Sequence, residues 1–116
     1  MSNQPEKNFC IDIHGSAVGG IGFRLGEDVY RHSAEFGYWL AEEFWGKGIM
    51  TEAVIAFVDY CFENFPLKRM FASAYANNPA SARVLEKAGF VLEGRLRKNV
   101  IKDGQVLDSL LYAKTK

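Results

Sequence analysis

The spacing of apolar residues changes once along the chain, and this change restricts the fold more than any other feature. Before position 41 three short runs predict β-strands: 8–14, where apolar residues alternate, 17–25, where glycines weaken the pattern, and 34–40. From Lys47 to about Asn64 the apolar residues instead recur every three or four positions, which predicts an amphipathic helix that ends before Pro66. Strands followed by this helical period are typical of a sheet with helices packed on it.

The second half of the chain contains clear start and stop signals. A strand is predicted over 70–76. Asn78-Pro79 then begins a second helix, because Asn is a favoured N-cap and Pro fits the first helical turn, and Gly89 ends it. Two last strands, 90–101 and 105–113, meet at Asp103-Gly104, a strong hairpin signal. We therefore predict an α/β (α+β) fold whose mixed sheet has antiparallel pairs at both ends and strand–helix–strand crossovers in the middle.

Length and charge narrow the class of protein. The 116 residues fit one domain, 1–116, and 48% hydrophobic residues suffice for a core. Fourteen basic residues balance fourteen acidic ones, so we expect neither nucleic acid nor an anionic membrane as partner. No apolar run approaches the roughly 20 residues of a membrane span, and the start, MSNQPEKN, lacks the apolar stretch of a signal peptide. A cytoplasmic protein is the default expectation.

The cysteines and histidines give no sign of a metal site or a disulfide framework. Cys10 lies in a strand-like run and Cys61 in a helix-like run, without CxxC or Cys/His spacing. Two reduced thiols are the preferred interpretation, with a disulfide as the alternative. His14 and His32 are too isolated to ligate a metal ion together, so we expect no metal.

The segment Trp45-Gly46-Lys47-Gly48-Ile49, between a strand and a long helix, is the most informative for chemistry. Two glycines let the backbone approach a ligand and point N–H groups outward, and the helix N-terminus adds partial positive charge. This arrangement suits phosphate oxygens, and Lys47 adds a mobile charge. A strand-to-helix turn without a ligand is the alternative. A Walker A loop would need Gly at position 41 and Ser or Thr at 48, and a dinucleotide fingerprint would need Gly or Ala at 51, so neither applies.

Three segments, in this order, resemble the GNAT superfamily of N-acetyltransferases. They are EFGYWL at 35–40, WGKG at 45–48, and NPASAR at 78–83 continuing through EKAGF at 86–90. The resemblance is strongest to the RimJ/RimL-like branch, which acetylates protein N-termini and other amines, and Glu93-Gly94 and Asp103-Gly104 also look like that branch. It implies a GNAT-like acyl-CoA N-acyltransferase fold with acetyl-CoA as co-substrate.

The resemblance also implies which residues bind acetyl-CoA. Backbone groups near Trp39-Leu40 and the side chain of Asn78 would hold the pantetheine arm, and Asn78 can serve as a helix cap as well. The family loop begins with Gln or Arg where this chain has Glu43, which leaves the backbone role of the loop intact. Arg83 and Lys87 either reach the CoA phosphates or form a solvated edge. The expected cofactor-binding residues are Trp39, Leu40, Trp45, Gly46, Lys47, Gly48, Ile49, Asn78, Ser81 and Arg83.

Acetyl transfer needs a base for the amine, a donor for the oxyanion and help for the leaving thiol. By resemblance, Glu35 matches a strand carboxylate that serves as base, with Glu93 as second candidate, and an N–H near Leu40 would meet the oxyanion. Another family branch has its base at the position of Val100, so that role does not carry over.

The leaving thiol is the third requirement. Many members use a tyrosine as acid where this chain has Leu85. Ser81 matches a serine that hydrogen-bonds the sulfur, and Tyr38 and Tyr75 are lesser substitutes. Both catalytic candidates also have a purely structural interpretation. Ser81 can be an ordinary serine in the first turn of a helix, and Glu35 can be an ordinary exposed strand glutamate.

GNAT domains usually begin with a strand and two helices that wall the acceptor site, and this chain is expected to start after them. An open flank and an exposed edge strand then favour a homodimer. Two functions remain open. The preferred one, supported by the intact glycine loop and Glu35, is transfer of an acetyl group to a primary amine by direct attack in a ternary complex. The other is a non-catalytic CoA-binding sensor or assembly module, favoured by the missing helices and Leu85.

Overall fold

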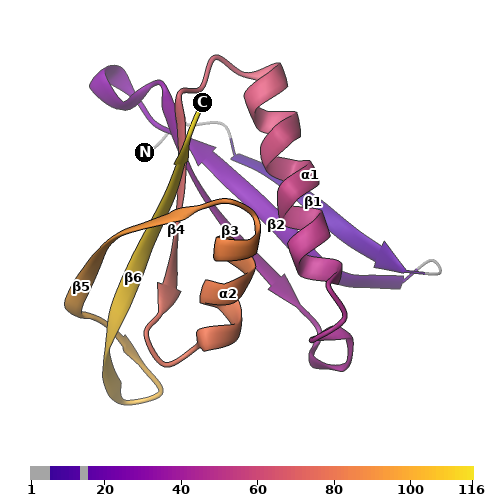
Figure 1. Ribbon diagram of the computed structural model, residues 1–116, viewed down its shortest axis with the longest axis vertical. Helices are drawn as coiled ribbons and strands as arrows, with labels where there is room; N and C mark the ends of the chain where they lie inside the picture. Colours follow the sequence, from indigo (N-terminus) through magenta and orange to yellow (C-terminus); the bar gives the residue numbers. More distant parts are fainter. Residues whose placement is uncertain (1–5, 14–15) are drawn as a thin grey trace.

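Six β-strands form one mixed sheet in the order β1-β2-β3-β4-β6-β5 (Figure 1). The computed structural model describes residues 6–13 and 16–116. The strands are β1 (Glu6–Ile13), β2 (Ser16–Leu25), β3 (Ser33–Leu40), β4 (Arg69–Tyr75), β5 (Val91–Lys102) and β6 (Gln105–Thr115). Among these described strands, β3 and β4 pair in parallel and every other neighbouring pair is antiparallel.

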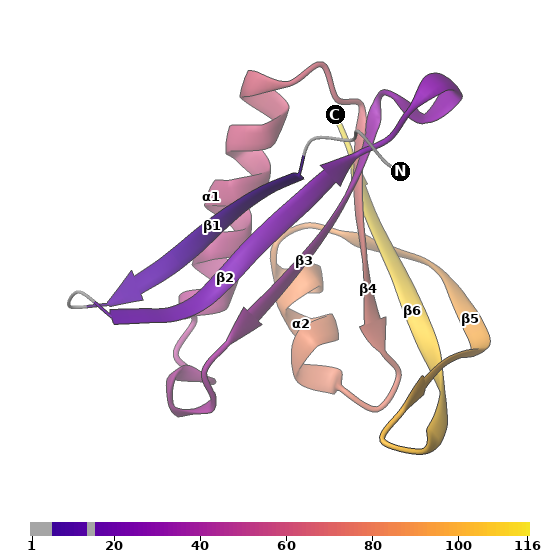
Figure 2. The same cartoon turned by 180° about the vertical axis from the view of Figure 1, so that it is seen from behind.

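Two α-helices, α1 (Ile49–Asn64) and α2 (Pro79–Lys87), lie on one face of the sheet (Figure 1). Seen from behind, the other face carries no helix from the part of the chain that the structure describes (Figure 2). The core lies between the helices and the sheet, because alternate strand residues point to the helix side. On the sheet these include Phe36 and Met70, and α1 contributes Val54, Val58 and Cys61, all buried.

The predicted order of strands and helices is confirmed, with ends shifted by a few residues. The helix predicted from Lys47 begins at Ile49, and the strand predicted over 90–101 runs from Val91 to Lys102. Two short 3₁₀ helices, Asp28–Tyr30 and Glu42–Phe44, occupy segments predicted as loops or left unassigned. The turn predicted at Gly15, with His14, lies outside the described residues.

The residues predicted to start or end helices and strands make the hydrogen bonds and adopt the backbone angles expected of them. The Asn78 side chain caps α2 by accepting a hydrogen bond from the Ser81 backbone N–H at 3.2 Å. Gly89, just after α2, has φ 91°, and the hairpin residues Asp103 and Gly104 have φ 51° and 78°. A left-handed backbone is what glycine allows and what a two-residue hairpin turn needs.

The middle of the sheet has the predicted strand–helix–strand crossovers. β3-α1-β4 joins neighbouring parallel strands, whereas β4-α2-β5 joins strands that run in the same direction with β6 between them, an order that the sequence did not predict. The strand that follows α2, β5, lies at the sheet edge, because β6 is inserted between β4 and β5. Such an insertion depends on long-range pairing, which local patterns do not encode.

The parallel pair β3–β4 is short, and this positions the candidate site. Its register runs from Ser33↔Arg69 to Glu35↔Phe71 and stops there. Beyond this point both strands continue, and the two views agree that they diverge toward their C-terminal ends (Figures 1 and 2). α2 lies over the gap between them on the helix side.

Cys61 is a free thiol in the core, and burial raises its pKa to about 12. The side chain of Cys10 is outside the described residues. His32 Nδ1 lies 2.8 Å from the Pro66 carbonyl oxygen. Among the described residues no group of His, Cys, Asp or Glu could hold a metal ion, and no helix is long and apolar enough to cross a membrane.

Candidate functional site

A cleft of about 400 Å³ lies on the helix side, where β3 and β4 separate. Three pieces of chain line it: the end of β3, the loop leading into α1, and the start of α2. The lining residues are Tyr38, Trp39, Leu40, Phe44, Trp45, Gly46, Gly48, Ile49, Met50, Thr51, Asn78, Ala80, Ser81, Arg83, Val84 and Lys87.

The loop before α1 leaves room for a ligand against backbone N–H groups. Gly46 and Gly48 both have φ 76°, a left-handed conformation that side chains disfavour. A Cβ added at either glycine would meet nothing within 4 Å, so the space beside the loop is open. Gly48 is the N-cap of α1 and supplies no side-chain cap bond. The first N–H groups of α1 therefore combine an open approach with the positive end of the helix dipole, which suits phosphate oxygens.

Trp45 ties this loop to the end of β3. Its indole Nε1–H donates to the Leu40 carbonyl oxygen at 2.7 Å, while the ring stays 59% exposed. Lys47 does not line the cleft; its Nζ lies 5.7 Å from the centre of the Phe44 ring. An exposed lysine side chain is long and flexible enough to move toward a bound phosphate.

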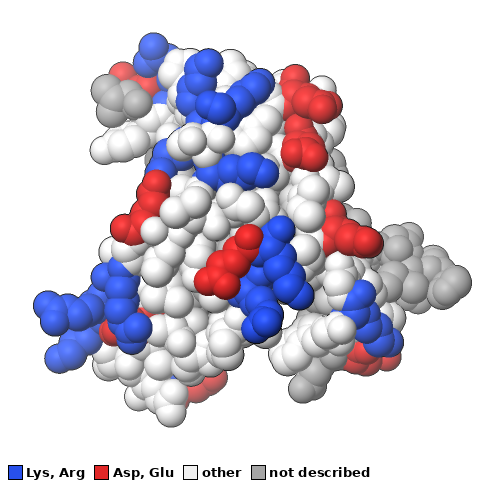
Figure 3. All heavy atoms as spheres, in the orientation of Figure 1, with Lys and Arg blue, Asp and Glu red and all other residues white. Residues whose placement is uncertain are grey.

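The first turns of α2 form the wall of the cleft opposite to the loop. Hydrogen bonds fix this helix near both of its ends. Asn78 caps its first turn, and Tyr112 on β6 donates a 2.8 Å hydrogen bond to Glu86 on its last turns. Arg83 and Lys87 face the cleft. Figure 3 shows basic and acidic atoms together over α2, acidic atoms along α1, and further basic atoms over the loop before α1, so α2 and this loop both bring positive charge to the cleft.

Tyr38 and Ser81 meet inside the cleft, from β3 and α2. The phenol oxygen lies 2.9 Å from Ser81 Oγ and donates to the Ser81 carbonyl oxygen at 3.0 Å. Burial raises the pKa of Tyr38, and the Ser81 hydrogen bond partly opposes that shift. Sequence reasoning ranked Tyr38 as a lesser candidate. The alternation Phe36, Tyr38, Leu40 could have identified it as pointing to the helix side.

Glu35 lies on the face of β3 opposite to the helices. It is exposed between the buried residues Ala34 and Phe36, so it does not line the cleft. Its Cα partners are Arg24 on β2 and Phe71 on β4, the last pair before the strands separate. Glu35 therefore lies where β3 and β4 separate, on the face of the sheet opposite to α1 and α2.

The other acid–base candidates have structural partners. Glu93 forms an ion pair with Arg69 at 2.7 Å, and this hydrogen-bonded guanidinium lowers the pKa of Glu93. Lys102 Nζ stacks 4.7 Å from the Tyr75 ring centre. Leu85 is fully buried and does not line the cleft, so its place on α2 belongs to the core.

Most residues predicted to bind CoA lie in this one cleft. Trp39, Leu40, Trp45, Gly46, Gly48, Ile49, Asn78, Ser81 and Arg83 line it, and Lys47 lies beside it. Of the two predicted catalytic residues, Ser81 is on its wall and Glu35 is on the opposite face of β3. Phe44, Met50, Thr51, Ala80 and Val84 also line the cleft but were not among the predicted binding residues.

Comparison with known proteins agrees with this geometry. The sequence profile of the family described as acetyltransferase (GNAT) domain matches residues 1–91. The chain belongs to the GNAT family. The resemblance noted at 35–90 is thereby confirmed, and relatives named as a ribosomal-protein-serine acetyltransferase and as RimJ confirm its RimJ/RimL-like character.

Individual relatives of this GNAT domain support the same family assignment. YdaF of Bacillus subtilis (strain 168) is 38% identical over 99 residues, which is 85% of this chain and 54% of YdaF. The ribosomal-protein-serine acetyltransferase of Escherichia coli (strain K12) is 32% identical and covers 93% of this chain and 60% of its own length. The Mycobacterium smegmatis RimJ structure in complex with CoA-disulfide has a TM-score of 0.87 and 34% identity, over 95% of this chain and 53% of RimJ. The chain thus spans only part of the length of the relatives that it matches.

Proposed function

We propose that this GNAT domain binds acetyl-CoA in the cleft between β3 and β4 and takes part in transferring the acetyl group to a primary amine. The observation that carries this proposal is the open loop at Gly46 and Gly48, with uncapped N–H groups of α1 at the point where the parallel strands separate. Relatives named as N-acetyltransferases, and a RimJ structure with CoA-disulfide, support it.

The residues present fit acetyl-CoA along the length of the cleft. The N–H groups of Gly48 and the first turn of α1 hold the pyrophosphate, and Arg83 and Lys87 face the same space. Backbone groups of Trp39 and Leu40 are free of the β4 ladder, because β3 pairs with β4 only up to Glu35. The pantetheine amides, which need partners of this kind, extend along that edge.

Acetyl-CoA supplies an activated thioester, and the chain's own groups do the rest. A backbone N–H near Leu40 meets the charge that develops on the acetyl oxygen. Glu35 accepts the proton of the amine, directly or through one water, from the face without helices. Glu93 is the weaker candidate, since its carboxylate is already paired with Arg69. A primary amine on a protein N-terminus or a small molecule is the proposed acceptor.

A change of melting temperature on adding acetyl-CoA tests the binding part. Acetyl-CoA at a hundred times its Kd should stabilise the fold by about 2.7 kcal/mol. Gly46→Glu should abolish the shift, since it fills the loop with a negative side chain. Gly104→Glu is the matched control: Gly104 also has positive φ, 78°, and an equally open Cβ position, but lies in the β5–β6 hairpin. If acetyl-CoA does not change the melting temperature of the unmodified chain, the proposed acetyl-CoA site is contradicted.

The second candidate function is a CoA-binding module without catalysis. The position of Glu35 outside the cleft and the burial of Leu85 favour it. Release of free thiol from acetyl-CoA in the presence of a panel of amines separates the two functions. Binding without thiol release with any amine assigns the non-catalytic role to this chain.

We further propose a cytoplasmic homodimer. The free Cys61 thiol fits a reducing compartment. The edge strand β5 and its hairpin expose Val91, Ile101 and Val106, at 67%, 77% and 56%, which is apolar surface that a second copy would cover. Sedimentation of a clean monomer at micromolar concentration would count against the dimer.

A further inference from the structure

Two hydroxyl groups meet across the cleft, and they come from segments far apart in the sequence. Tyr38 extends from β3, Ser81 lies in the first turn of α2, and the phenol oxygen is within 3.0 Å of both Ser81 Oγ and the Ser81 carbonyl oxygen. Both side chains line the cleft. The pair therefore presents hydroxyl chemistry to whatever occupies that space.

The number of hydrogens restricts how this pair can be arranged. The phenol carries one hydrogen, and the carbonyl oxygen can only accept. If Tyr38 donates to the Ser81 carbonyl, Ser81 Oγ–H points back at the phenol oxygen. If Tyr38 donates to Ser81 Oγ instead, the Ser81 hydrogen is released toward the cleft. A negative ligand atom in the cleft favours the second arrangement, because each donor in such a chain strengthens the next.

Both oxygens are held in place by the fold. The Tyr38 ring packs against Phe36 at 6.1 Å between centroids, and Phe36 packs in turn against Phe57 and Phe90 at 6.1 and 5.3 Å. Ser81 is fixed by the Asn78 cap on its backbone N–H. Burial raises the pKa of Tyr38, so the phenol keeps its hydrogen through the neutral and mildly alkaline range. A rigid, protonated pair needs little reorganisation when charge develops beside it.

The family resemblance already implies that Ser81 hydrogen-bonds the sulfur of coenzyme A; we propose that Tyr38 is a positioning residue, which through its hydrogen bond to Ser81 orients the Ser81 hydrogen toward that sulfur. The inference rests on the proposed function, because it requires a CoA thioester in the cleft. It assigns to Tyr38 a role that neither the glycine loop nor the helix cap supplies.

The chemical balance of acetyl transfer shows where such a donor is needed. As the amine nitrogen bonds to the acetyl carbon, the carbon–sulfur bond breaks and its electron pair stays on sulfur. The amine proton leaves to Glu35 or water, and the thiolate later takes a proton from solvent. A thiolate is a weaker base than a phenolate, so Tyr38 and Ser81 stabilise it by hydrogen bonding and keep their own protons.

Binding of CoA and of desulfo-CoA, which lacks the sulfur, tests this without any turnover. A donor pair lowers the thiol pKa of bound CoA below its free value of about 8.5, so the preference for CoA over desulfo-CoA should rise with pH. A lowering by one unit raises that preference about sevenfold between about pH 7 and about pH 9.5. Desulfo-CoA shares the phosphates and the protein's other titrations, so these cancel in the ratio.

The variants separate positioning from structure. In Tyr38→Phe the rise should fall to about threefold, and in Ser81→Ala it should disappear. The double variant should match Ser81→Ala, because Tyr38 acts through Ser81. Tyr30→Phe, at a 69% exposed tyrosine outside the cleft, is the matched control and should behave as the unmodified chain.

Each remaining outcome decides against the proposal. A preference that does not change with pH in the unmodified chain means that the pair does not contact the sulfur. A full rise in Tyr38→Phe removes Tyr38 from the role and leaves Ser81 alone. If neither CoA nor desulfo-CoA binds, the proposed function fails together with the inference, whereas the first two results leave CoA binding intact.

Discussion

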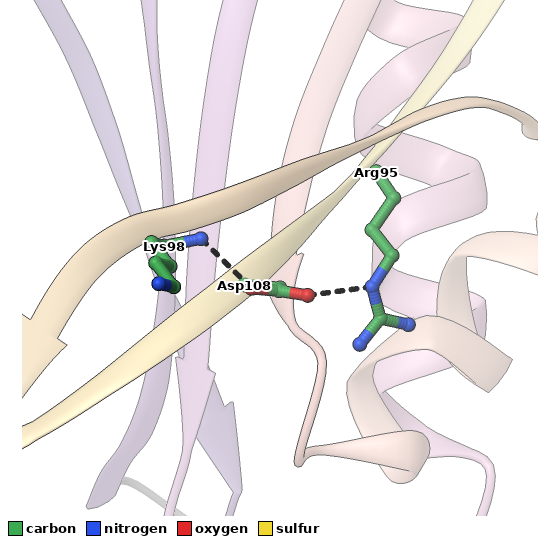
Figure 4. A network of polar contacts seen from close by, with 3 residues as sticks. All are labelled: Arg95, Lys98 and Asp108. Carbon is green, nitrogen blue, oxygen red and sulfur yellow. Dashed lines mark hydrogen bonds and ion pairs between the residues drawn. The ribbon is translucent and has the colours of Figure 1, made fainter.

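Arg95 on β5 donates its Nε hydrogen to Asp108 Oδ2 on β6 at 2.6 Å, across the hairpin (Figure 4). The other carboxylate oxygen of Asp108 accepts from the Lys98 backbone N–H at 2.8 Å. Lys98 has φ 52° and sits where the β5–β6 register shifts, between Leu96 and Val100. The Asp108 carboxylate therefore accepts a backbone N–H from a bulged segment whose residues have no partner in the β5–β6 ladder.

This arrangement predicts acid sensitivity of the hairpin. The Lys98 backbone hydrogen bond first, and then Arg95, lower the pKa of Asp108 in the folded state. A lowered folded pKa gives stability that is present above the unfolded value of about 3.9 and is lost as pH falls through the folded value. Asp108→Asn should therefore reduce the melting temperature at pH 7, with a difference that shrinks below about pH 4.

The control is Asp59→Asn, at an exposed position of α1. Melting curves of all three proteins across this pH range provide the measurement. Parallel curves for the unmodified chain and Asp108→Asn would show that the carboxylate charge does not stabilise the hairpin.

Leu85 on α2 is predicted to be a stability residue. It is 0% exposed and belongs to the core cluster, so Leu85→Ala leaves a cavity and should cost about 2–5 kcal/mol of the free energy of unfolding. That corresponds to a melting temperature lower by roughly 10 °C or more. Val91→Ala, at a 67% exposed strand position, should cost less than about 1 kcal/mol. Equal losses for the two variants would contradict the burial of Leu85.

Asn78 is predicted both to cap α2 and to hydrogen-bond the pantetheine arm of acetyl-CoA. One pair of variants separates these two roles. Ser is also a good N-cap, so Asn78→Ser should keep the stability of the fold within a few tenths of a kcal/mol, whereas Asn78→Ala should lose about 1 kcal/mol. Both variants lose the Asn78 amide donor, so both should bind acetyl-CoA about three- to tenfold more weakly. Unchanged affinity in Asn78→Ser would restrict Asn78 to the helix cap.

Glu35 is predicted to act as the base of acetyl transfer. Glu35→Gln keeps the shape but accepts no proton, so it should lower kcat/KM for amine-dependent thiol release by about 10²- to 10⁴-fold. Acetyl-CoA binding should not change, because Glu35 does not line the cleft. Glu63→Gln, at an exposed position on α1, is the control. An unaffected rate in Glu35→Gln would remove this residue from the mechanism.

The local chemistry of the chain was sufficient to predict the order of its strands and α-helices and, to within a few residues, their ends. Pro66, the Asn78 cap, Gly89 and the Asp103-Gly104 turn each act on their own backbone or on residues a few positions away. The glycine loop was predicted for the same reason, because glycine permits the positive φ that Gly46 and Gly48 adopt.

Only the tertiary structure decided which of these elements meet. The insertion of β6 between β4 and β5 and the end of the β3–β4 ladder at Glu35 depend on pairing between distant strands. The meeting of Tyr38 with Ser81, 43 residues apart, depends on how α2 packs over that gap. Residue type and periodicity determine which side of an element a group occupies, but distances across the cleft arise from packing, which no local pattern records.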